Sequence, residues 1–246
     1  MVKELKTGFV VMVVMTVITG FLYPALITVI AQTLFHDKAN GSLIVVNGQV
    51  IGSHLLGQNF GKPEYFHPRA SAAGSGYDAT ASAGTNLGPT SAKLLNGAIN
   101  TDDKGKESVG FDGLKTRLVH YCLENDVPYE SSIPVDQFKD SNGDLDDIKL
   151  IKAFGDEKSP LVFRAKTPIP ADAITGSASG LDPDISPANA EIQAARVAKG
   201  RGVSVDQIRA IVGERTIGRT LGILGEPHIN VLELNLALDE RFPARK

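Results

Sequence analysis

The sequence predicts an α+β domain that lies outside the cytoplasm on a single N-terminal transmembrane helix. Three observations lead to this prediction. An uncharged apolar stretch runs from Gly8 to Ala31, basic residues precede it, and the rest of the chain combines one hairpin pattern with several amphipathic helix patterns. Alternating apolar residues are typical of strands, and apolar residues three and four apart are typical of helices.

The stretch 8–31 is long enough to cross a membrane. At about 1.5 Å per residue it forms a rod of roughly 36 Å, whereas a hydrocarbon core is about 30 Å thick. A cleaved signal peptide is an alternative, since Val29-Ile30-Ala31 fits a small-residue cleavage site, although the run is about twice as long as a signal core. A buried helix of a soluble protein is a second alternative.

Charges on either side of this stretch predict its orientation. Lys3 and Lys6 precede it, whereas Lys38 beyond it is offset by Asp37. Cationic residues favour the cytoplasmic side of a span. We therefore expect residues 1–7 in the cytoplasm, the helix 8–31 in the cell (plasma or inner) membrane, and the domain 36–246 outside the cytoplasm.

One face of the predicted helix carries small and polar residues at every fourth position. Small residues let helix backbones approach closely, and hydroxyl or amide groups can form hydrogen bonds between helices. A lone anchor does not need such a stripe, so we interpret it as a face for a partner helix. Its members are Thr16, Gly20, Pro24, Thr28 and Gln32.

Composition excludes several classes of function. The net charge is -3 and no long basic run is present, so nucleic acid is not an expected partner. Cys122 is the single cysteine, and we interpret it as a small buried apolar residue. The five histidines are far apart in sequence, and no Cys and His spacing predicts a metal site.

Local patterns predict the elements of the domain. Leu43 to Val46 and Gln49 to Gly52 flank an Asn47-Gly48 pair, which indicates a hairpin. We expect this hairpin to belong to a small sheet covered by the helices after Ser186. A short helix is expected at Ser91 to Ile99.

The C-terminal third carries clear helix signals. Ser186 with Pro187 starts one helix, which ends at Gly200 or Gly202. Ser204 with Gln207 forms a capping box for the next. A third is expected at Val231 to Leu238 after an Asn230 cap, although its alternating leucines also fit a strand.

The segment from about 100 to 167 differs from its surroundings. It is charged and punctuated by Gly and Pro, with a weakly amphipathic stretch at Leu114 to Leu123, and we interpret it as an insertion. Asp140 to Asp146 suggests a calcium loop, but Leu145 replaces the glycine at position six and Ile151 the glutamate at position twelve. A solvated Asx turn is the preferred interpretation.

Familiar catalytic patterns are missing. In Gly176-Ser177-Ala178-Ser179-Gly180, alanine occupies the place of the nucleophilic serine. The chain also lacks Gly-Lys-Ser/Thr, a full dinucleotide fingerprint and Asp-Lys-Thr-Gly. We therefore expect no enzymatic activity and no catalytic residue in this chain alone.

Several motifs, in this order, resemble the KdpC family, the small single-span subunit of the Kdp potassium-transporting P-type ATPase. They include Thr19-Gly20-Phe21-Leu22-Tyr23-Pro24, Asn40-Gly41-Ser42-Leu43, Gly57-Gln58-Asn59-Phe60, Tyr65-Phe66-His67-Pro68-Arg69-Ala70-Ser71, Asn86-Leu87-Gly88, Ser177-Ala178-Ser179-Gly180-Leu181-Asp182-Pro183, Gln193 with Arg196-Val197-Ala198, and Asn230 to Asp239.

The resemblance implies an accessory subunit that assembles and stabilises a potassium import complex. Its partners would be a channel-like potassium-binding subunit, a P-type ATPase subunit and a small single-helix peptide. ATP, Mg²⁺ and K⁺ would be used in those partners, with no cofactor or metal held by this chain. An effect on nucleotide affinity, proposed for the family, would have to pass through the span or the partners, because ATP is cytoplasmic.

The resemblance also implies a shared functional surface in the domain. On physical grounds, Arg69 or Arg196 could pair with Asp182 or with a carboxylate of a partner. Its members are Gln58, Asn59, Phe60, Tyr65, Arg69, Ser71, Ser177, Ser179, Asp182 and Arg196. The alternative is that these residues only shape loops. Without the resemblance, a membrane-anchored module that binds a small polar ligand outside the cytoplasm remains the rival function.

Overall fold

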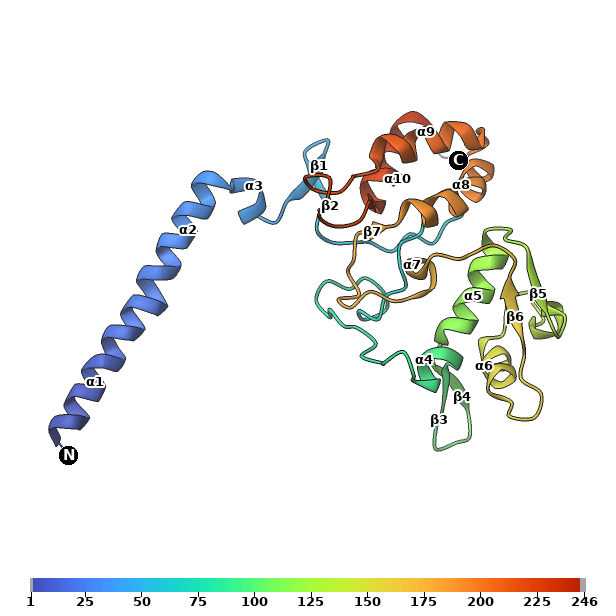
Figure 1. The fold of residues 1–246 in the computed structure, drawn as a ribbon, viewed down its shortest axis with the longest axis horizontal. Helices are drawn as coiled ribbons and strands as arrows, with labels where there is room; N and C mark the ends of the chain where they lie inside the picture. Colours follow the sequence, from blue (N-terminus) through green and yellow to red (C-terminus); the bar gives the residue numbers. More distant parts are fainter. Residues whose placement is uncertain (1, 244–246) are drawn as a thin grey trace. The chain divides into compact units, whose positions relative to one another are not determined.

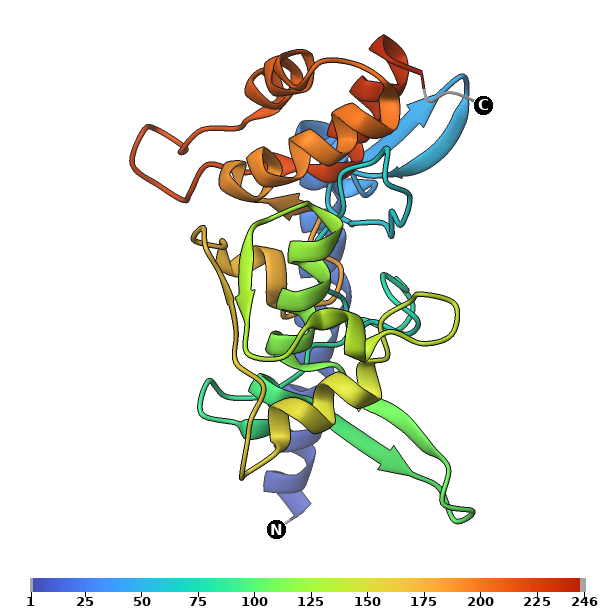
Figure 2. The same cartoon turned by 90° about the vertical axis from the view of Figure 1, so that its right-hand side faces the viewer.

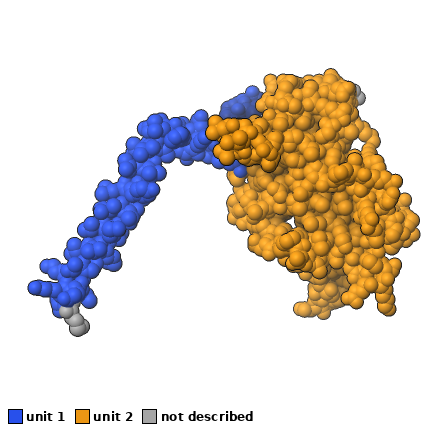
Figure 3. Space-filling model, in the orientation of Figure 1, with its two compact units in different colours: residues 1–55 blue, residues 56–246 orange. Residues whose placement is uncertain are grey.

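The computed structural model describes residues 2–243, so Met1 and residues 244–246 of the predicted ranges lie outside it. The chain divides into two compact units, residues 1–55 and 56–246 (Figure 3). The first unit holds the apolar helix and a hairpin. The second is a domain of short helices and two-stranded ladders.

The apolar helix of the first unit runs over Val2–Leu34, and its mean hydropathy is 2.3. It consists of α1 (Val2–Val17), the π-helical turn η1 (Ile18–Leu22) and α2 (Tyr23–Leu34). All its large apolar side chains are exposed, as a lipid-facing helix requires. Among the described residues it is the one helix long and apolar enough to cross a membrane, and it extends beyond the predicted bounds 8–31.

The π-helical turn has a local cause in the sequence. Pro24 lies at the start of α2, where it has no N–H to donate, and in a regular α-helix its ring would crowd the carbonyl of Gly20, four residues earlier. The wide turn lies directly before it, with the Tyr23 N–H donating to the Ile18 oxygen. Such turns occur inside α-helices as single extra residues.

The predicted hairpin is confirmed. After the short helix α3 (His36–Ala39), β1 (Leu43–Val46) pairs antiparallel with β2 (Gln49–Ser53). The turn residues have the positive φ that this loop requires, 52° at Asn47 and 78° at Gly48.

The predicted sheet around that hairpin is wrong. Within residues 2–243 the strands form four separate two-stranded ladders, β1-β2, β3-β4, β5-β6 and β7-β8. Most of the large apolar residues of β1 and β2 are exposed. The hairpin pattern in the sequence predicts only the pairing of these two neighbouring strands, so it could not show whether a third strand joins them.

The helices after Ser186 form one core of the second unit. They are α8 (Pro187–Arg201), α9 (Val205–Arg215) and α10 (Val231–Arg241), and Figure 1 shows them grouped together with the ladder of β7 (Asp184–Ile185) and β8 (Ile229–Asn230). The predicted caps are confirmed: the side chains of Ser186, Ser204 and Asn230 each accept a backbone N–H from the first turn. Gly202, at φ 67°, ends α8.

The segment predicted to be an insertion has a core of its own, formed around Val119, Cys122, Leu150, Phe154 and Phe163. The part of unit 2 that holds this core contains α4 (Ala92–Asn96), β3 (Ala98–Thr101), β4 (Glu107–Phe111), α5 (Gly113–Glu124), β5 (Tyr129–Ser131), η2 (Val135–Phe138), α6 (Asp147–Gly155), β6 (Phe163–Ala165) and α7 (Ala171–Ile174). Whether this segment is an insertion stays a prediction.

Two local predictions in this region have different outcomes. The helix expected at Ser91 to Ile99 ends earlier, because Gly97 adopts φ 92° and Ile99 belongs to β3. The Asx turn is confirmed, since an Asp140 carboxylate oxygen accepts the N–H groups of Asn142 and Asp144 at 2.8 and 3.0 Å.

Candidate functional site

Side-chain amides of two helices hold the backbone of the loop that carries Phe66 and His67. The Gln193 oxygen accepts the His67 N–H at 2.7 Å and its nitrogen donates to the His67 carbonyl at 3.1 Å. The Asn235 side-chain oxygen accepts the Phe66 N–H at 2.9 Å, and its nitrogen donates to the Phe66 carbonyl at 3.0 Å. Each amide pairs both the backbone N–H and the backbone carbonyl of one residue, as a neighbouring β-strand would do. The Phe66 ring is thereby fixed in the core, where it is fully buried.

Arg196 joins this loop to α5. Its guanidinium donates to the carbonyls of Pro63 and Tyr65 at 2.8 and 2.9 Å, and to Asn125 and Gln193 at 3.0 and 2.8 Å. Burial lowers the pKa of Arg196, although the Glu124 carboxylate nearby opposes that shift. The side chain therefore acts as an internal cross-link.

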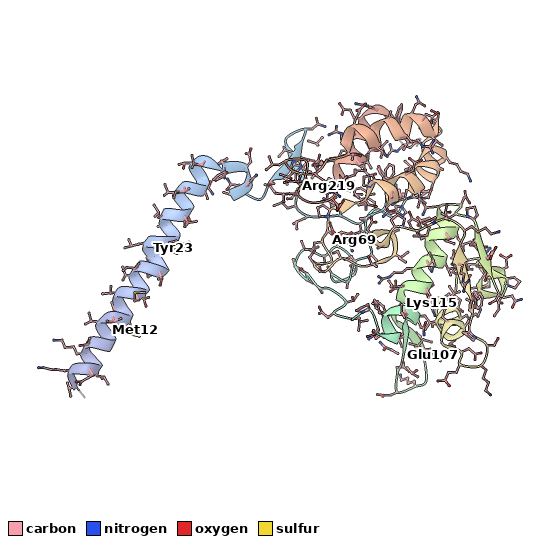
Figure 4. All side chains as sticks on the ribbon, in the orientation of Figure 1. Met12, Tyr23, Arg69, Glu107, Lys115 and Arg219 are labelled. Carbon is pink, nitrogen blue, oxygen red and sulfur yellow. The ribbon has the colours of Figure 1, made fainter. Side chains whose placement is uncertain are left out.

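Arg69 (Figure 4) connects the loop to a segment more than a hundred residues further along the chain. Its Nη1 lies 2.8 Å from an Asp182 carboxylate oxygen, and its Nη2 donates to the Gly176 carbonyl at 3.1 Å. The pairing of Arg69 with Asp182 that we expected is confirmed. Arg196 has other partners, so the alternative pairing of Arg196 with Asp182 is wrong.

Ser71 and Tyr77 complete this connection. The Ser71 hydroxyl donates to the Gly180 carbonyl at 2.6 Å and accepts the N–H of Tyr77 at 2.9 Å. The Tyr77 hydroxyl donates to the Arg69 carbonyl at 2.8 Å. Burial, and then the negative charge of Asp182, raise the pKa of Tyr77, so this hydroxyl stays protonated and keeps donating.

Glycine is required where these segments meet. A Cβ on Gly57 would lie 2.4 Å from the Tyr77 ring and 2.6 Å from the Asp182 carbonyl oxygen. Gly180 adopts φ 69°, and a Cβ there would meet the Ala83 oxygen at 2.6 Å. Both positions demand a residue without a side chain.

A cleft with a volume of about 510 Å³ opens beside these residues. One wall comes from the loop, and the other carries charged side chains of α5 and its surroundings. The first wall includes the predicted residues Asn59, Phe60, Arg69 and Ser71, and the second includes Asp112, Arg117, His120 and Glu124.

The charges on the second wall are already paired. His67 lies 2.7 Å from Glu124, His120 lies 2.6 Å from Asp147, and Arg117 forms an ion pair with Asp112 at 2.7 Å. Burial alone would raise the pKa of Glu124, but the hydrogen bond from His67 and the positive charges of His67 and Arg196 lower it. The hydrogen bond to Asp147 raises the pKa of His120, and burial opposes the shift.

The remaining predicted site residues lie apart from the cleft or inside the domain. Tyr65 donates its hydroxyl to Asp239 at 3.1 Å. Ser177 is only 4% exposed and Arg196 only 8%, whereas the backbone carbonyl of Ser179 accepts the Ala83 N–H. Gln58 is not among the residues that line the cleft.

Sequence reasoning did not place three important residues in the site: Gln193, Asn235 and Arg201. Arg201, 2% exposed, donates to the Glu64 carbonyl at 2.8 Å and its guanidinium lies 4.9 Å from the Tyr65 ring centre. A signal was present, because amide and guanidinium residues occur on the apolar faces of α8 and α10. Buried polar side chains need hydrogen-bond partners, so such positions indicate an internal network.

Within residues 2–243, no group of three or more His, Cys, Asp or Glu side chains could hold a metal ion. Burial raises the pKa of the Cys122 thiol to about 11, and this side chain is fully buried. A protonated, inaccessible thiol is not a nucleophile.

These features define a class of protein: an α+β domain, cross-linked by internal hydrogen bonds and without a group of potential metal ligands among its described residues, on one N-terminal transmembrane helix. The family model for the c chain of K⁺-transporting ATPase, KdpC, matches residues 5–154 and 141–240. The chain belongs to the KdpC family.

Curated relatives agree with this assignment. The chain is 44% identical over 243 residues to the potassium-transporting ATPase KdpC subunit of Koribacter versatilis, covering 99% of this chain and 97% of that protein. It is 40% identical to the KdpC subunit of Mycobacterium tuberculosis (strain ATCC 25618 / H37Rv), covering 96% and 98%. The Myxococcus xanthus KdpC subunit is 42% identical, covering 94% and 84%.

Proposed function

We propose that this chain is the non-catalytic accessory subunit of a potassium-transporting ATPase, and that it assembles and stabilises the complex. The observation that carries the proposal is the match to KdpC subunits over nearly the full length of both chains. ATP hydrolysis belongs to a partner, since this sequence lacks a Gly-Lys-Ser/Thr phosphate loop and an Asp-Lys-Thr-Gly phosphorylation site. The match favours this role over a ligand-binding module.

The partners in this proposal are a channel-like potassium-binding subunit, a P-type ATPase subunit and a small single-helix peptide. ATP, Mg²⁺ and K⁺ are used by those partners. In this proposal the N-terminus lies in the cytoplasm and the domain lies outside it, anchored in the cell membrane. Lys3 and Lys6, on the N-terminal side of the apolar helix, support this orientation. Residues 100–167 are an insertion that folds around a core of its own.

The anchor contacts a partner helix through the stripe from Thr16 to Gln32. In a regular α-helix residues four apart drift by about 40°, so Gln32 would lie about 160° around the helix from Thr16. The single extra residue of the π-helical turn removes about 100° of that rotation, which leaves about 60°. The turn imposed by Pro24 thus supports one continuous face of Thr16, Gly20, Pro24, Thr28 and Gln32.

The domain presents the cleft and its rim to the partners. Asn59, Phe60 and the exposed edges of Arg69 and Ser71 form the contact surface in this proposal, together with Gln58 and Tyr65. Ser177, Ser179, Asp182 and Arg196 support it from within, because their bonds fix the loops that carry the surface. Polar groups held in place lose little freedom on binding, which favours association.

A glycine substitution tests the helix contact. Gly20→Leu puts a bulky side chain in the middle of the stripe, whereas Gly8→Leu places the same side chain near the end of the helix. A Cβ at Gly8 has no atom within 4 Å, and a Cβ at Gly20 meets the Thr16 methyl at 3.9 Å, an ordinary contact. We expect the tagged G20L chain to recover far less of the two large partner subunits from mild detergent than the wild type or G8L. Equal recovery by all three chains would refute the helix contact, and recovery of the wild-type chain alone would refute the accessory function.

A further inference from the structure

The loop between α9 and β8, residues 216–228, leaves several apolar side chains exposed; we call it the apolar loop. Leu221 is 85% exposed, Ile223 75% and Leu224 57%. Figure 2 shows the loop extending away from the helices of its own unit. Exposed apolar side chains grouped on one element mark a contact with a protein or a membrane.

Hydrogen bonds hold the apolar loop in one shape. Ile217 and His228 exchange two backbone bonds of 2.9 and 3.1 Å at its base, and Leu224 N–H and Thr220 N–H bond to each other's carbonyls nearer the tip. Arg219 (Figure 4) donates to both carboxylate oxygens of Glu226 at 2.8 and 2.7 Å. A loop held in this way pays little conformational entropy when it binds.

The tip is built so that its apolar side chains point outward. Leu221 adopts φ 55°, in the left-handed region that leucine rarely enters, and Gly222 follows at φ 77°. Strained residues of this kind cluster where a chain clamps a ligand or partner. The loop keeps this strained leucine although its side chain is 85% exposed.

We propose that the apolar loop is a docking element that inserts Leu221, Ile223 and Leu224 into an uncharged apolar recess on the extracytoplasmic side of a membrane-embedded partner subunit. This proposal rests on the accessory function proposed above. It adds a further contact on the domain to those proposed above for the helix and for the rim of the cleft.

The composition of the loop favours a protein recess over a lipid surface. Segments that lie on membranes combine apolar residues with Lys or Arg and with aromatic side chains at the interface. The apolar loop has one Arg and one Glu, which neutralise each other, and no Trp, Tyr or Phe. Protein interfaces are built around aromatic or aliphatic anchors that fill a pocket of the partner, and preorganised anchors lose less entropy on binding.

A cysteine placed on the tip tests this proposal. Cys122 is the single cysteine of the chain and is fully buried, so Leu221→Cys or Ile223→Cys adds the one accessible thiol. Val162→Cys is the matched control, because Val162 is another exposed apolar residue, 45% exposed, outside the loop. The reaction of each full-length chain with N-ethylmaleimide is measured alone in detergent, in the purified complex, and alone in phosphatidylethanolamine and phosphatidylglycerol vesicles.

We expect the tip cysteines to react roughly tenfold more slowly in the complex than alone, in detergent or in vesicles, because a docked anchor is desolvated. V162C should react equally in all three. A complex that forms while the tip cysteines stay reactive overturns the docking element and leaves the accessory function intact. Protection in vesicles or in the isolated chain overturns it in favour of lipid or a second copy, and the absence of any complex overturns both proposals.

Discussion

Gln193 offers the sharpest test of how the candidate site is held together. Its buried amide bonds to the N–H and the carbonyl of His67 and accepts from Arg196. Its nitrogen also donates to the Asn189 side-chain oxygen at 2.9 Å. Gln193→Leu keeps a similar volume and removes all four bonds, although Asn189 keeps the donor from the Tyr121 hydroxyl. Gln193→Glu keeps the acceptor for His67 and Arg196 and removes the donor to the His67 carbonyl and to Asn189.

The magnitude follows from the groups that are left without partners. A buried backbone N–H or carbonyl without a hydrogen bond costs about 1–3 kcal/mol. Q193L leaves two such groups, on His67, whereas Arg196 keeps three other acceptors. We therefore expect Q193L to lower the free energy of unfolding by about 3 kcal/mol, and Q193E to lower it by about half as much.

Urea denaturation of the full-length chain in detergent measures these values. The near-ultraviolet signal of tyrosine reports the domain, because the sequence has no Trp and four of the five Tyr lie beyond the apolar helix. Amide hydrogen exchange of the peptide that carries Phe66 and His67 provides the local readout. Q193L should speed exchange there, because the amide that held the loop is gone.

Gln137→Leu is the matched control, since Gln137 is exposed in η2. We expect it to change the free energy of unfolding by less than about 0.5 kcal/mol. If Q193L also stays within that limit, or if exchange at Phe66 and His67 is unchanged, the amide does not hold the loop and the reasoning fails.

Three further predictions concern the ion pairs and the close approach of loops. A double-mutant cycle of Arg69→Met and Asp182→Asn, followed by urea denaturation, should give a coupling energy of about 1 kcal/mol, because the pair is mostly buried. Gly57→Ala should lower the free energy of unfolding by about 1–3 kcal/mol, since its Cβ meets a ring and a carbonyl. Asp147→Asn should remove stability at low pH, because the Asp147 hydrogen bond raises the pKa of His120.

The sign of the pH effect follows from the raised pKa of His120 in the folded chain. The stabilisation is fully present below the unfolded pKa of about 6.5 and is lost as the pH rises through the folded value. The difference in unfolding midpoint between wild type and D147N should therefore be largest in acid and shrink toward alkaline pH; a difference that grows with pH contradicts this.

The other two predictions have their own controls. Gly61→Ala is the control for Gly57→Ala, and it should leave the free energy of unfolding unchanged because no atom lies within 4 Å of its Cβ. A coupling energy near zero would show that Arg69 and Asp182 act independently.

Elements set by local chemistry were predictable from the sequence. The Asn47-Gly48 hairpin and the caps at Ser186, Ser204 and Asn230 each depend on side chains within four residues. The apolar helix was equally predictable, because its length and hydropathy can be read from the sequence without knowing what the helix contacts. The end of the short helix at Gly97 was missed, since a glycine inside an apolar pattern does not by itself reveal φ 92°.

Contacts between distant segments were predictable only in part. Arg69 and Asp182 were paired correctly because opposite charges in two loop motifs suggest one bond. The partner of Arg196 was ambiguous, because backbone carbonyls also accept hydrogen bonds from a guanidinium and a sequence does not show which carbonyls lie near it. Gln193 and Asn235 bind backbone too, which explains why spacing alone did not place them in the site.

The most direct test of the central claim is potassium-stimulated ATP hydrolysis by the partner subunits, purified with and without this chain. We expect the complex with the wild-type chain to be stable and active, and the partners without it to lose subunits and activity. The chain alone should hydrolyse no ATP. Equal stability and equal activity of the partners in the absence of this chain would contradict its role as an assembling and stabilising subunit.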